Sequence, residues 1–342
     1  MKYRASVFGL FCLLVLAINL FGADEPRIAS LIKQLDAADA SVRRRAAITL
    51  GGMGELAHAA VPALTDMLQN DKAALNRSSA AFALGGIDTP DAKKALSDAL
   101  SRWQKAVEVN PTDEAVRYNL GIIYQQMGEL DKAIPEFKAA IRIKADFSAA
   151  YNNLGKAYGI QGNFEAAISA FTTAVQIDPI SPVLHTNLGI VYQQQGKFDG
   201  AISAYKKAIE IDPNYAESYT NLGIVYRKQG RFEGAVEAYK TAISLNPNYA
   251  EAHNNLGYVY EDLNRWDEAI AAYMEAIQVN PNLAETYANL GFIYERQGRN
   301  AEAIAQYRSF IRLASENAAL KDLIAEAQRR IQIIEAKSKL FD

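Results

Sequence analysis

An asparagine recurs six times in this sequence at a constant step of 34 residues, each time followed by leucine and glycine. A carboxamide both donates and accepts hydrogen bonds, so a column of them can bind the backbone of another chain without reading its side chains. Three residues after each asparagine stands a second column, whose mostly apolar or aromatic members suit side-chain pockets. The alternative is that the asparagines support helix packing. We predict a peptide-binding surface made of Asn119, Asn153, Asn187, Asn221, Asn255, Asn289, Ile122, Lys156, Ile190, Ile224, Tyr258 and Phe292.

The other residues that could do chemistry do not converge. His185 and His253 occupy one position of two separate copies, and His58 lies outside the repeats, so packing is a better explanation for them than metal binding. Adjacent carboxylates such as Glu261 and Asp262 fall at helix ends, where charges commonly serve the helix. The glycines are spaced as helix stops and lack the lysine of a phosphate loop. We therefore predict a protein that is not an enzyme and has no metal and no cofactor.

Pairs of helices must position the asparagine column. Each copy has a tyrosine four residues after its leucine, which places both on one helical face. A second helix follows, in which a small residue precedes an aromatic by four positions and lets two helices approach closely. These columns are Tyr124, Tyr158, Tyr192, Tyr226, Tyr260 and Tyr294; Ala133, Ala167, Ala201, Ala235, Ala269 and Ala303; and Phe137, Phe171, Tyr205, Tyr239, Tyr273 and Tyr307.

The breaks between helices also recur. A residue able to adopt a left-handed conformation ends each first helix, and a proline follows most second helices because it cannot continue them. These positions are Gly128, Gly162, Gly196, Gly230, Asn264 and Gly298, and Pro179, Pro213, Pro247 and Pro281.

The period, columns and breaks together resemble the tetratricopeptide repeat over residues 114–317. The resemblance implies an all-α, right-handed solenoid of six helix-turn-helix units that binds proteins. The asparagine column resembles the asparagine ladder in the superhelical arm of the O-linked N-acetylglucosamine transferase, which binds extended protein segments. Asn300, Phe310 and Ser315 depart from the repeat pattern, as expected of an end copy, so we expect Tyr294 to be less enclosed than Tyr226.

The segments on either side of the array are also helical in pattern. Residues 24–90 contain two copies of a motif with arginine, paired alanines, leucine and glycine, which resembles a pair of HEAT-like repeats. Residues 91–113 match the second half of a degenerate tetratricopeptide unit. Residues 318–342 carry an apolar stripe that predicts a capping helix. The stripe comprises Leu320, Leu323, Ile324, Ala327, Ile331 and Ile334, with Lys321, Glu326, Arg329, Arg330 and Lys337 facing away.

The first 23 residues resemble an export signal. Lys2 and Arg4 precede a short apolar run that ends with small residues before Asp24. We expect cleavage near Ala23 and a periplasmic or secreted protein; the alternative is a membrane anchor retained at residues 7–23. Cys12, the single cysteine, lies in this leader, so disulfide bonds within the chain are excluded.

Charge and composition restrict the function further. The chain has 36 basic and 39 acidic residues, a balance that argues against nucleic acid as its partner. The pattern favours a non-enzymatic scaffold that binds a protein or peptide segment of unknown identity on its concave face. Two alternatives stay open: a structural subunit of an envelope or secretion assembly, and a regulatory arm of a glycosyltransferase system. The sequence does not indicate the peptide preference, the oligomeric state or the pathway.

Overall fold

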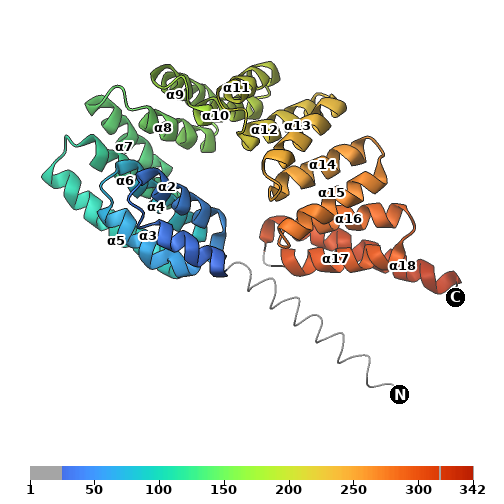
Figure 1. Cartoon of the computed structure of the whole chain (residues 1–342). Helices are drawn as coiled ribbons and strands as arrows, with labels where there is room; N and C mark the ends of the chain where they lie inside the picture. Colours follow the sequence, from blue (N-terminus) through green and yellow to red (C-terminus); the bar gives the residue numbers. More distant parts are fainter. Residues whose placement is uncertain (1–24, 316, 342) are drawn as a thin grey trace. The chain divides into compact units, whose positions relative to one another are not determined.

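The structure, a computed structural model, describes residues 25–315 and 317–341, and the predicted leader lies outside this range. The described residues form helices joined by turns and contain no strand (Figure 1). None of the described helices has the length and apolar character needed to cross a membrane. The chain divides after Asp178 into two compact units. The division falls within the predicted repeat array.

The first unit begins with the HEAT-like segment. A helix over residues 25–34 precedes α2, and α4 packs against both α2 and α3. Leu64 and Leu68 of α3 are almost inaccessible in the core of this segment. The elements are α2 (Ala40–Gly52), the 3-10 helix η1 (Gly54–Ala60), α3 (Val61–Asn70) and α4 (Ala74–Ile87).

The rest of the first unit consists of helices that pack on this segment and on each other. α5 begins at Pro90, where the Thr89 hydroxyl accepts a hydrogen bond from the Ala92 N–H and caps the helix. Both α4 and α5 contact α6, so the HEAT-like segment continues directly into the 34-residue repeats. The helices are α5 (Pro90–Val109), α6 (Glu114–Gln126), α7 (Leu130–Ile143), α8 (Ser148–Ile160) and α9 (Phe164–Ile177).

The second unit contains four helical pairs and a final helix (Figure 1). Within each pair the two helices pack closely, and each second helix also contacts the first helix of the next pair. Among the first helices, α12 contacts both α10 and α14 directly. The elements are α10 (Pro182–Gln194), α11 (Phe198–Ile211), α12 (Ala216–Lys228), α13 (Phe232–Leu245), α14 (Ala250–Asp262), α15 (Trp266–Val279), α16 (Ala284–Arg296), α17 (Asn300–Ala314), η2 (Ala318–Leu320) and α18 (Lys321–Phe341).

The glycine of each Asn-Leu-Gly triplet lets the two helices of a pair meet. A Cβ on Gly223 would lie 2.7 Å from Cε1 of Tyr239, and one on Gly189 would lie 2.5 Å from Cε1 of Tyr205. These aromatic rings are fully buried against the glycine backbone. The helix packing therefore needs glycine at this position, a role that the sequence pattern alone did not reveal.

The predicted turns are confirmed. Gly128 and the equivalent glycines in the other copies have φ between 72° and 78°, and Asn264 has φ of 57°. A residue with a side chain other than Asn or Asp would be strained there. Each first helix therefore ends where the sequence predicted.

The C-terminal helix α18 packs against α17 and closes the second unit, as predicted. Ala327 and Ile334 are buried, and Phe310 of α17 is completely enclosed in the same cluster. Two details of the predicted stripe are wrong. Leu323 is 53% exposed, and Arg330 does not face away but forms a 3.0 Å ion pair with Glu295 of α16.

The expected difference between a central and a terminal tyrosine is also wrong. Tyr226 is 8% exposed and Tyr294 is 6% exposed. An arginine lies over each ring at 4.1 Å from the ring centroid, Arg231 over Tyr226 and Arg299 over Tyr294. The last pair is therefore as well packed as a central one.

Candidate functional site

Four asparagines of the predicted column lie on consecutive first helices of the second unit: Asn187, Asn221, Asn255 and Asn289. All four are partly exposed. Cross-repeat contacts show that neighbouring first helices are in register. The hydroxyl oxygens of Thr186 and Ser218 lie 2.7 Å apart, and Thr286 donates a 2.9 Å hydrogen bond to Asn254. The column therefore forms a continuous line of carboxamides across α10, α12, α14 and α16.

The carboxamides of this line are not all engaged in the same way. Asn221 donates a 3.0 Å hydrogen bond to the backbone oxygen of Glu217, one turn earlier in α12. Asn187 also has a partner within the chain. Asn255 has no hydrogen-bond partner among the described residues, and neither does Nδ2 of Asn289. Asn255 of α14 therefore retains hydrogen-bonding capacity for a ligand, whereas Nδ2 of Asn289 is buried and cannot reach one.

The two asparagines of the first unit, Asn119 and Asn153, have different surroundings from each other. Asn119 is 1% exposed, and both its polar atoms lack a partner among the described residues. Asn153 donates 2.8 Å and 3.1 Å hydrogen bonds to the Tyr118 hydroxyl and the Ala149 oxygen. Ile122 is also buried, at 5% exposure. Because α4 and α8 both pack on α6, Asn119 and Ile122 cannot contribute to the predicted surface.

The second predicted column follows the asparagine line. In the second unit Ile190, Ile224, Tyr258 and Phe292 are partly buried, and Lys156 of the first unit is half-buried with a partner of its own. Side chains of this column therefore border the carboxamides but are not fully open to solvent.

Arginines cover the two aromatic members of this column. The Arg227 guanidinium lies 4.9 Å from the centroid of Tyr258, and Arg330 lies 5.4 Å from that of Phe292. Arg296 also approaches Phe292, at 5.7 Å. Such contacts attract a cation to the ring face, so each aromatic surface is shared with a positive charge.

Ion pairs link the C-terminal ends of α12 and α14 to each other, and the C-terminal end of α16 to the middle of α18. Arg227 Nε lies 2.6 Å from Asp262 Oδ2, and Arg330 Nη1 lies 3.0 Å from Glu295 Oε2. Each pair joins residues 35 positions apart, one repeat plus one residue. Opposite charges at this spacing are a signal of such pairs that the sequence contains. Much of the charge near the C-terminal ends of these first helices is therefore neutralised by a residue of a neighbouring helix.

A second network joins the two helices of a pair. The hydroxyl of Tyr205 donates to Gln193, that of Tyr273 to Glu261 and that of Tyr307 to Glu295, over 2.8 to 3.1 Å. Burial raises the pKa of all three tyrosines above the usual value, so they remain protonated donors. Burial also raises the pKa of Glu261. This carboxylate therefore has a structural partner and is not positioned as a free acid or base.

Two of the three histidines have backbone partners within the chain. His185 Nε2 lies 3.1 Å from the Pro179 oxygen, and His253 Nε2 lies 3.0 Å from the Pro247 oxygen. Tyr287 donates to the Pro281 oxygen in the same way. His58 is exposed. Among the described residues, no three His, Cys, Asp or Glu side chains come together as a metal site.

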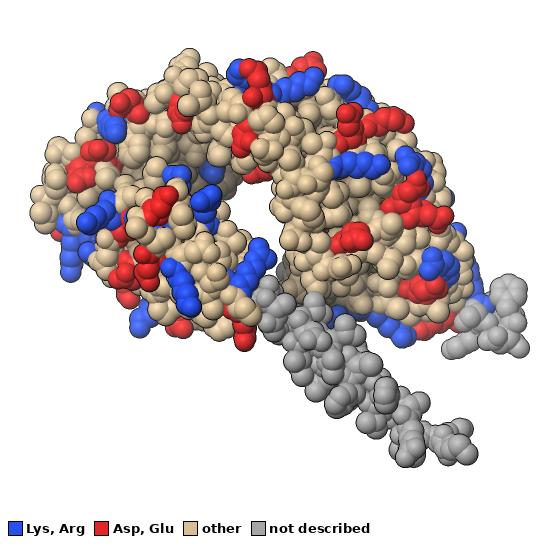
Figure 2. All heavy atoms as spheres, viewed as in Figure 1, with Lys and Arg blue, Asp and Glu red and all other residues tan. Residues whose placement is uncertain are grey.

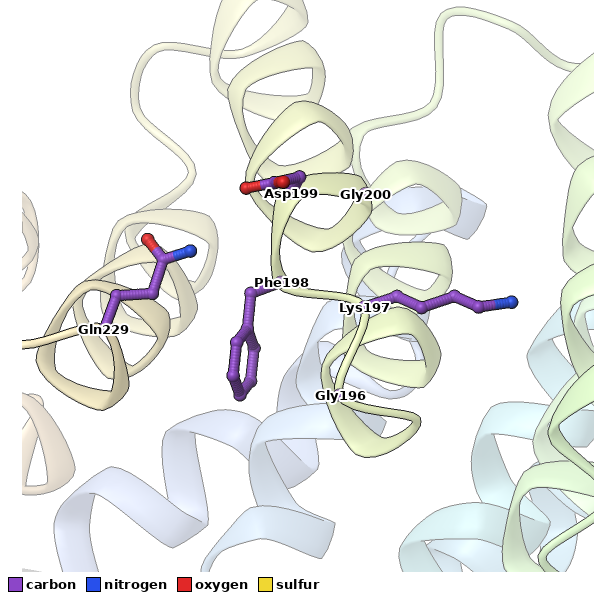
Figure 3. Close-up of a pocket in the computed structure, with 6 residues that line it drawn as sticks. All are labelled: Gly196, Lys197, Phe198, Asp199, Gly200 and Gln229. Carbon is purple, nitrogen blue, oxygen red and sulfur yellow. The ribbon is translucent and has the colours of Figure 1, made fainter.

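The surface also contains a shallow pocket away from the asparagine line. It lies at the turn between α10 and α11, where Phe198 and Gln229 face one another across it (Figure 3). Gly196, Lys197, Asp199 and Gly200 complete the lining. The pocket is open and mostly polar. Figure 2 shows basic and acidic side chains interspersed over the visible surface of each unit.

Comparisons with known families agree with this geometry. A model described as TPR repeat matches residues 92–128, 123–162, 193–230, 225–264 and 260–298. Tetratricopeptide repeat models match residues 148–180 and 284–317, and a HEAT repeats model matches residues 28–108. The chain belongs to the tetratricopeptide repeat family and carries HEAT repeats before its array. Proteins of this family are generally non-catalytic scaffolds that bind protein partners or peptides.

One solved structure shows the same class of fold, and two others match about half of this chain. One chain of the Cut9–Hcn1 hetero-tetramer of the APC/C is 19% identical to this chain. The match has a TM-score of 0.56 and covers 83% of this chain and 59% of that chain. MamA is 28% identical, with a TM-score of 0.44 over 48% of this chain and 97% of MamA. YrrB, a TPR protein with an unusual peptide-binding site, is 21% identical, with a TM-score of 0.43 over 55% and 96%. A comparison with curated proteins finds no match.

Proposed function

We propose that this protein is a non-enzymatic scaffold that binds a segment of a partner protein on the surface formed by α10, α12, α14 and α16. The observation that carries the proposal is the line of four partly exposed asparagines on these helices. A carboxamide pairs with both the N–H and the C=O of a peptide backbone, so a line of them suits an elongated segment. Membership of the tetratricopeptide repeat family supports the same function.

The protein acts through binding alone in this proposal. Glu261 and His185 of the second unit have structural partners, the Tyr273 hydroxyl and the Pro179 oxygen. We further propose that it works outside the cytoplasm, because its first residues resemble an export signal.

The experiment replaces Asn187, Asn221 and Asn255 by alanine together. The probe is a peptide that the wild-type chain selects from a random library. Each lost hydrogen bond weakens binding by about 0.5 to 1.5 kcal/mol, so affinity should fall by about one to three orders of magnitude. Alanine is the better helix former, so helicity should be retained.

The matched control changes three exposed polar residues of the second helices, Ser203, Ser244 and Gln278, to alanine. The control should bind as the wild type does. Equal affinity of the asparagine variant and the control would refute the proposal. Equal affinity accompanied by a collapsed melting temperature would assign the asparagines to packing.

A further inference from the structure

Three glutamates lie one helical turn before the asparagines of α12, α14 and α16. Glu217, Glu251 and Glu285 precede Asn221, Asn255 and Asn289 by four residues, which places each pair on one helical face. The hydrogen bond from Asn221 Nδ2 to the Glu217 oxygen shows that the asparagine side chain lies over this turn. The glutamates therefore form a third column beside the carboxamides.

The negative charge of this column is not compensated within the described residues. Glu251 and Glu285 are exposed and form no ion pair there, whereas Arg227 and Arg330 pair with other acids. Glu217 accepts a 2.7 Å hydrogen bond from Tyr215, which is a neutral donor.

The basic residues of the same helices are too far away to neutralise the column. Lys228 and Arg296 stand eleven residues after Glu217 and Glu285. Eleven residues of helix span about 16 Å. That distance exceeds the Debye length of about 8 Å at physiological ionic strength. The surface is therefore acidic along the starts of the helices and nearly balanced along their ends.

The spacing of the first helices restricts the conformation of a bound segment. Side-chain contacts between α10 and α12 and between α14 and α16 join residues 32 positions apart, and those between α12 and α14 and between α16 and α18 join residues 35 apart. These nearly constant differences in residue number require that the helices run side by side in the same direction. Helices in such contact have axes about 8 to 10 Å apart. A segment that crosses α12, α14 and α16 meets an equivalent glutamate and asparagine once in each such interval.

Polyproline II geometry matches this interval. Its rise of about 3.1 Å and three residues per turn bring the same face of the segment back every 9 Å or so. A β-strand alternates its faces, so every third side chain would point away from the surface. Polyproline II also leaves its backbone groups without internal hydrogen bonds, and the carboxamides can supply them.

We propose that the partner segment is a polyproline II helix with lysine or arginine at every third residue. This inference rests on the proposed function and specifies its partner class. The basic side chains pair with Glu217, Glu251 and Glu285, and backbone groups bind the asparagine line. Proline rings lie against the second column at its aliphatic members Ile190 and Ile224, because arginines cover Tyr258 and Phe292.

The test measures binding of the full chain to a fluorescent peptide that repeats Lys-Pro-Ala across the length of the four helices. A second peptide has the same composition, but one half of its length carries lysine at every second residue. It tests whether binding needs lysine at every third residue. A peptide that repeats Glu-Pro-Ala tests the sign of the charge. The regular lysine peptide should bind at least about tenfold more tightly than either, and rising salt should weaken it.

Variants separate this inference from the proposed function. Changing Glu217, Glu251 and Glu285 to glutamine should reduce affinity for the regular peptide about tenfold. The control changes three exposed acids of the second helices, Glu233, Glu237 and Glu275, to glutamine and should leave affinity unaltered.

Each remaining outcome overturns one statement only. Equal binding by the two glutamine variants, or tight binding of the Glu-Pro-Ala peptide, would refute the basic partner. Equal binding of the regular and irregular lysine peptides would refute the polyproline II geometry. Loss of library-peptide binding in the asparagine variant, with no effect of the glutamate variant on any peptide, would retain the function and reject this partner class.

Discussion

A Cβ added to Gly223 of α12 would lie 2.7 Å from Cε1 of Tyr239 in α13. The equivalent glycine and aromatic ring are in contact in every pair of the array, where an added Cβ would lie 2.5 to 2.9 Å from the nearest ring atom. The contact sets the distance between the two helices, because neither the ring nor the backbone can yield without repacking. Each helical pair therefore depends on the glycine of its Asn-Leu-Gly triplet.

Gly223→Ala should destabilise the protein even though alanine is the better helix former. Overpacking typically costs about 1 to 3 kcal/mol, which exceeds the gain in helix propensity of about 1 kcal/mol. The matched control is Gly52→Ala, since a Cβ at Gly52 of α2 meets no atom within 4 Å. Chemical denaturation checks both variants. A Gly223→Ala variant at least as stable as the Gly52→Ala variant would contradict this account.

Tyr226→Ala and Tyr294→Ala should lower the free energy of unfolding by similar amounts. Both rings are more than nine-tenths buried and each lies beneath an arginine. Truncation of a buried aromatic costs about 3 to 5 kcal/mol. Tyr192 is only half-buried, so Tyr192→Ala should cost less. Denaturant midpoints decide the matter, and a much smaller shift for Tyr294→Ala would show that the terminal pair is loosely packed.

The contrast with the expectation for Tyr294 shows how far the sequence can predict this fold. A constant period transfers each assignment from one copy to the next, so the helices, the left-handed turns at Gly128 and Asn264, and the capping helix were all predictable. Burial at the ends of the array depends on neighbours that are not copies. Arg330 of α18 and the HEAT-like helix α4 are such neighbours, and they determine the packing around Glu295 and Asn119.

Glu261→Gln should change how stability depends on pH. Burial raises the pKa of Glu261 from its usual 4.5, because loss of solvent disfavours the charged form by more than the hydrogen bond from Tyr273 favours it. A group with a raised pKa stabilises the fold fully below pH 4.5 or so, and this contribution is lost as pH rises through the folded-state pKa. The wild type should therefore lose stability relative to the glutamine variant as the pH rises from about 4.5 through the folded-state pKa.

The control for this titration is Glu268→Gln. Arg265 hydrogen-bonds the Glu268 carboxylate and lowers its pKa, so its contribution is present above its unfolded pKa and lost as pH falls. The two variants should thus diverge from the wild type in opposite directions with pH. Thermal melts across the range measure both, and parallel curves for wild type and Glu261→Gln would exclude a raised pKa at Glu261.

The leader prediction concerns residues outside the described range. The basic start, the short apolar run and the small residues before Asp24 predict export and cleavage close to Ala23. Mass spectrometry of the N-terminus, after expression in the cell of origin, gives the answer. A soluble cytoplasmic protein with an intact leader would remove the proposed location, and an intact leader in the membrane fraction would support the retained anchor.

Asn119 and Asn255 occupy the same position of two copies and should respond differently to replacement. Asn119 is buried with both polar atoms unpaired, and an unsatisfied buried group costs about 1 to 3 kcal/mol. Asn119→Ala should therefore leave stability unchanged or raise it, and it should not alter peptide binding. Asn255 is partly exposed, so Asn255→Ala should keep the melting temperature and weaken binding several-fold.

The paired measurement of melting temperature and affinity distinguishes two roles for one sequence position. The column resembles a uniform ladder in the sequence, but α4 and α8 pack on α6 and cover its first member. Weaker binding in Asn119→Ala with unchanged stability would mean that this region opens to admit a ligand. Equal affinity of Asn255→Ala and the wild type would remove α14 from the binding surface and leave its asparagine as a packing residue.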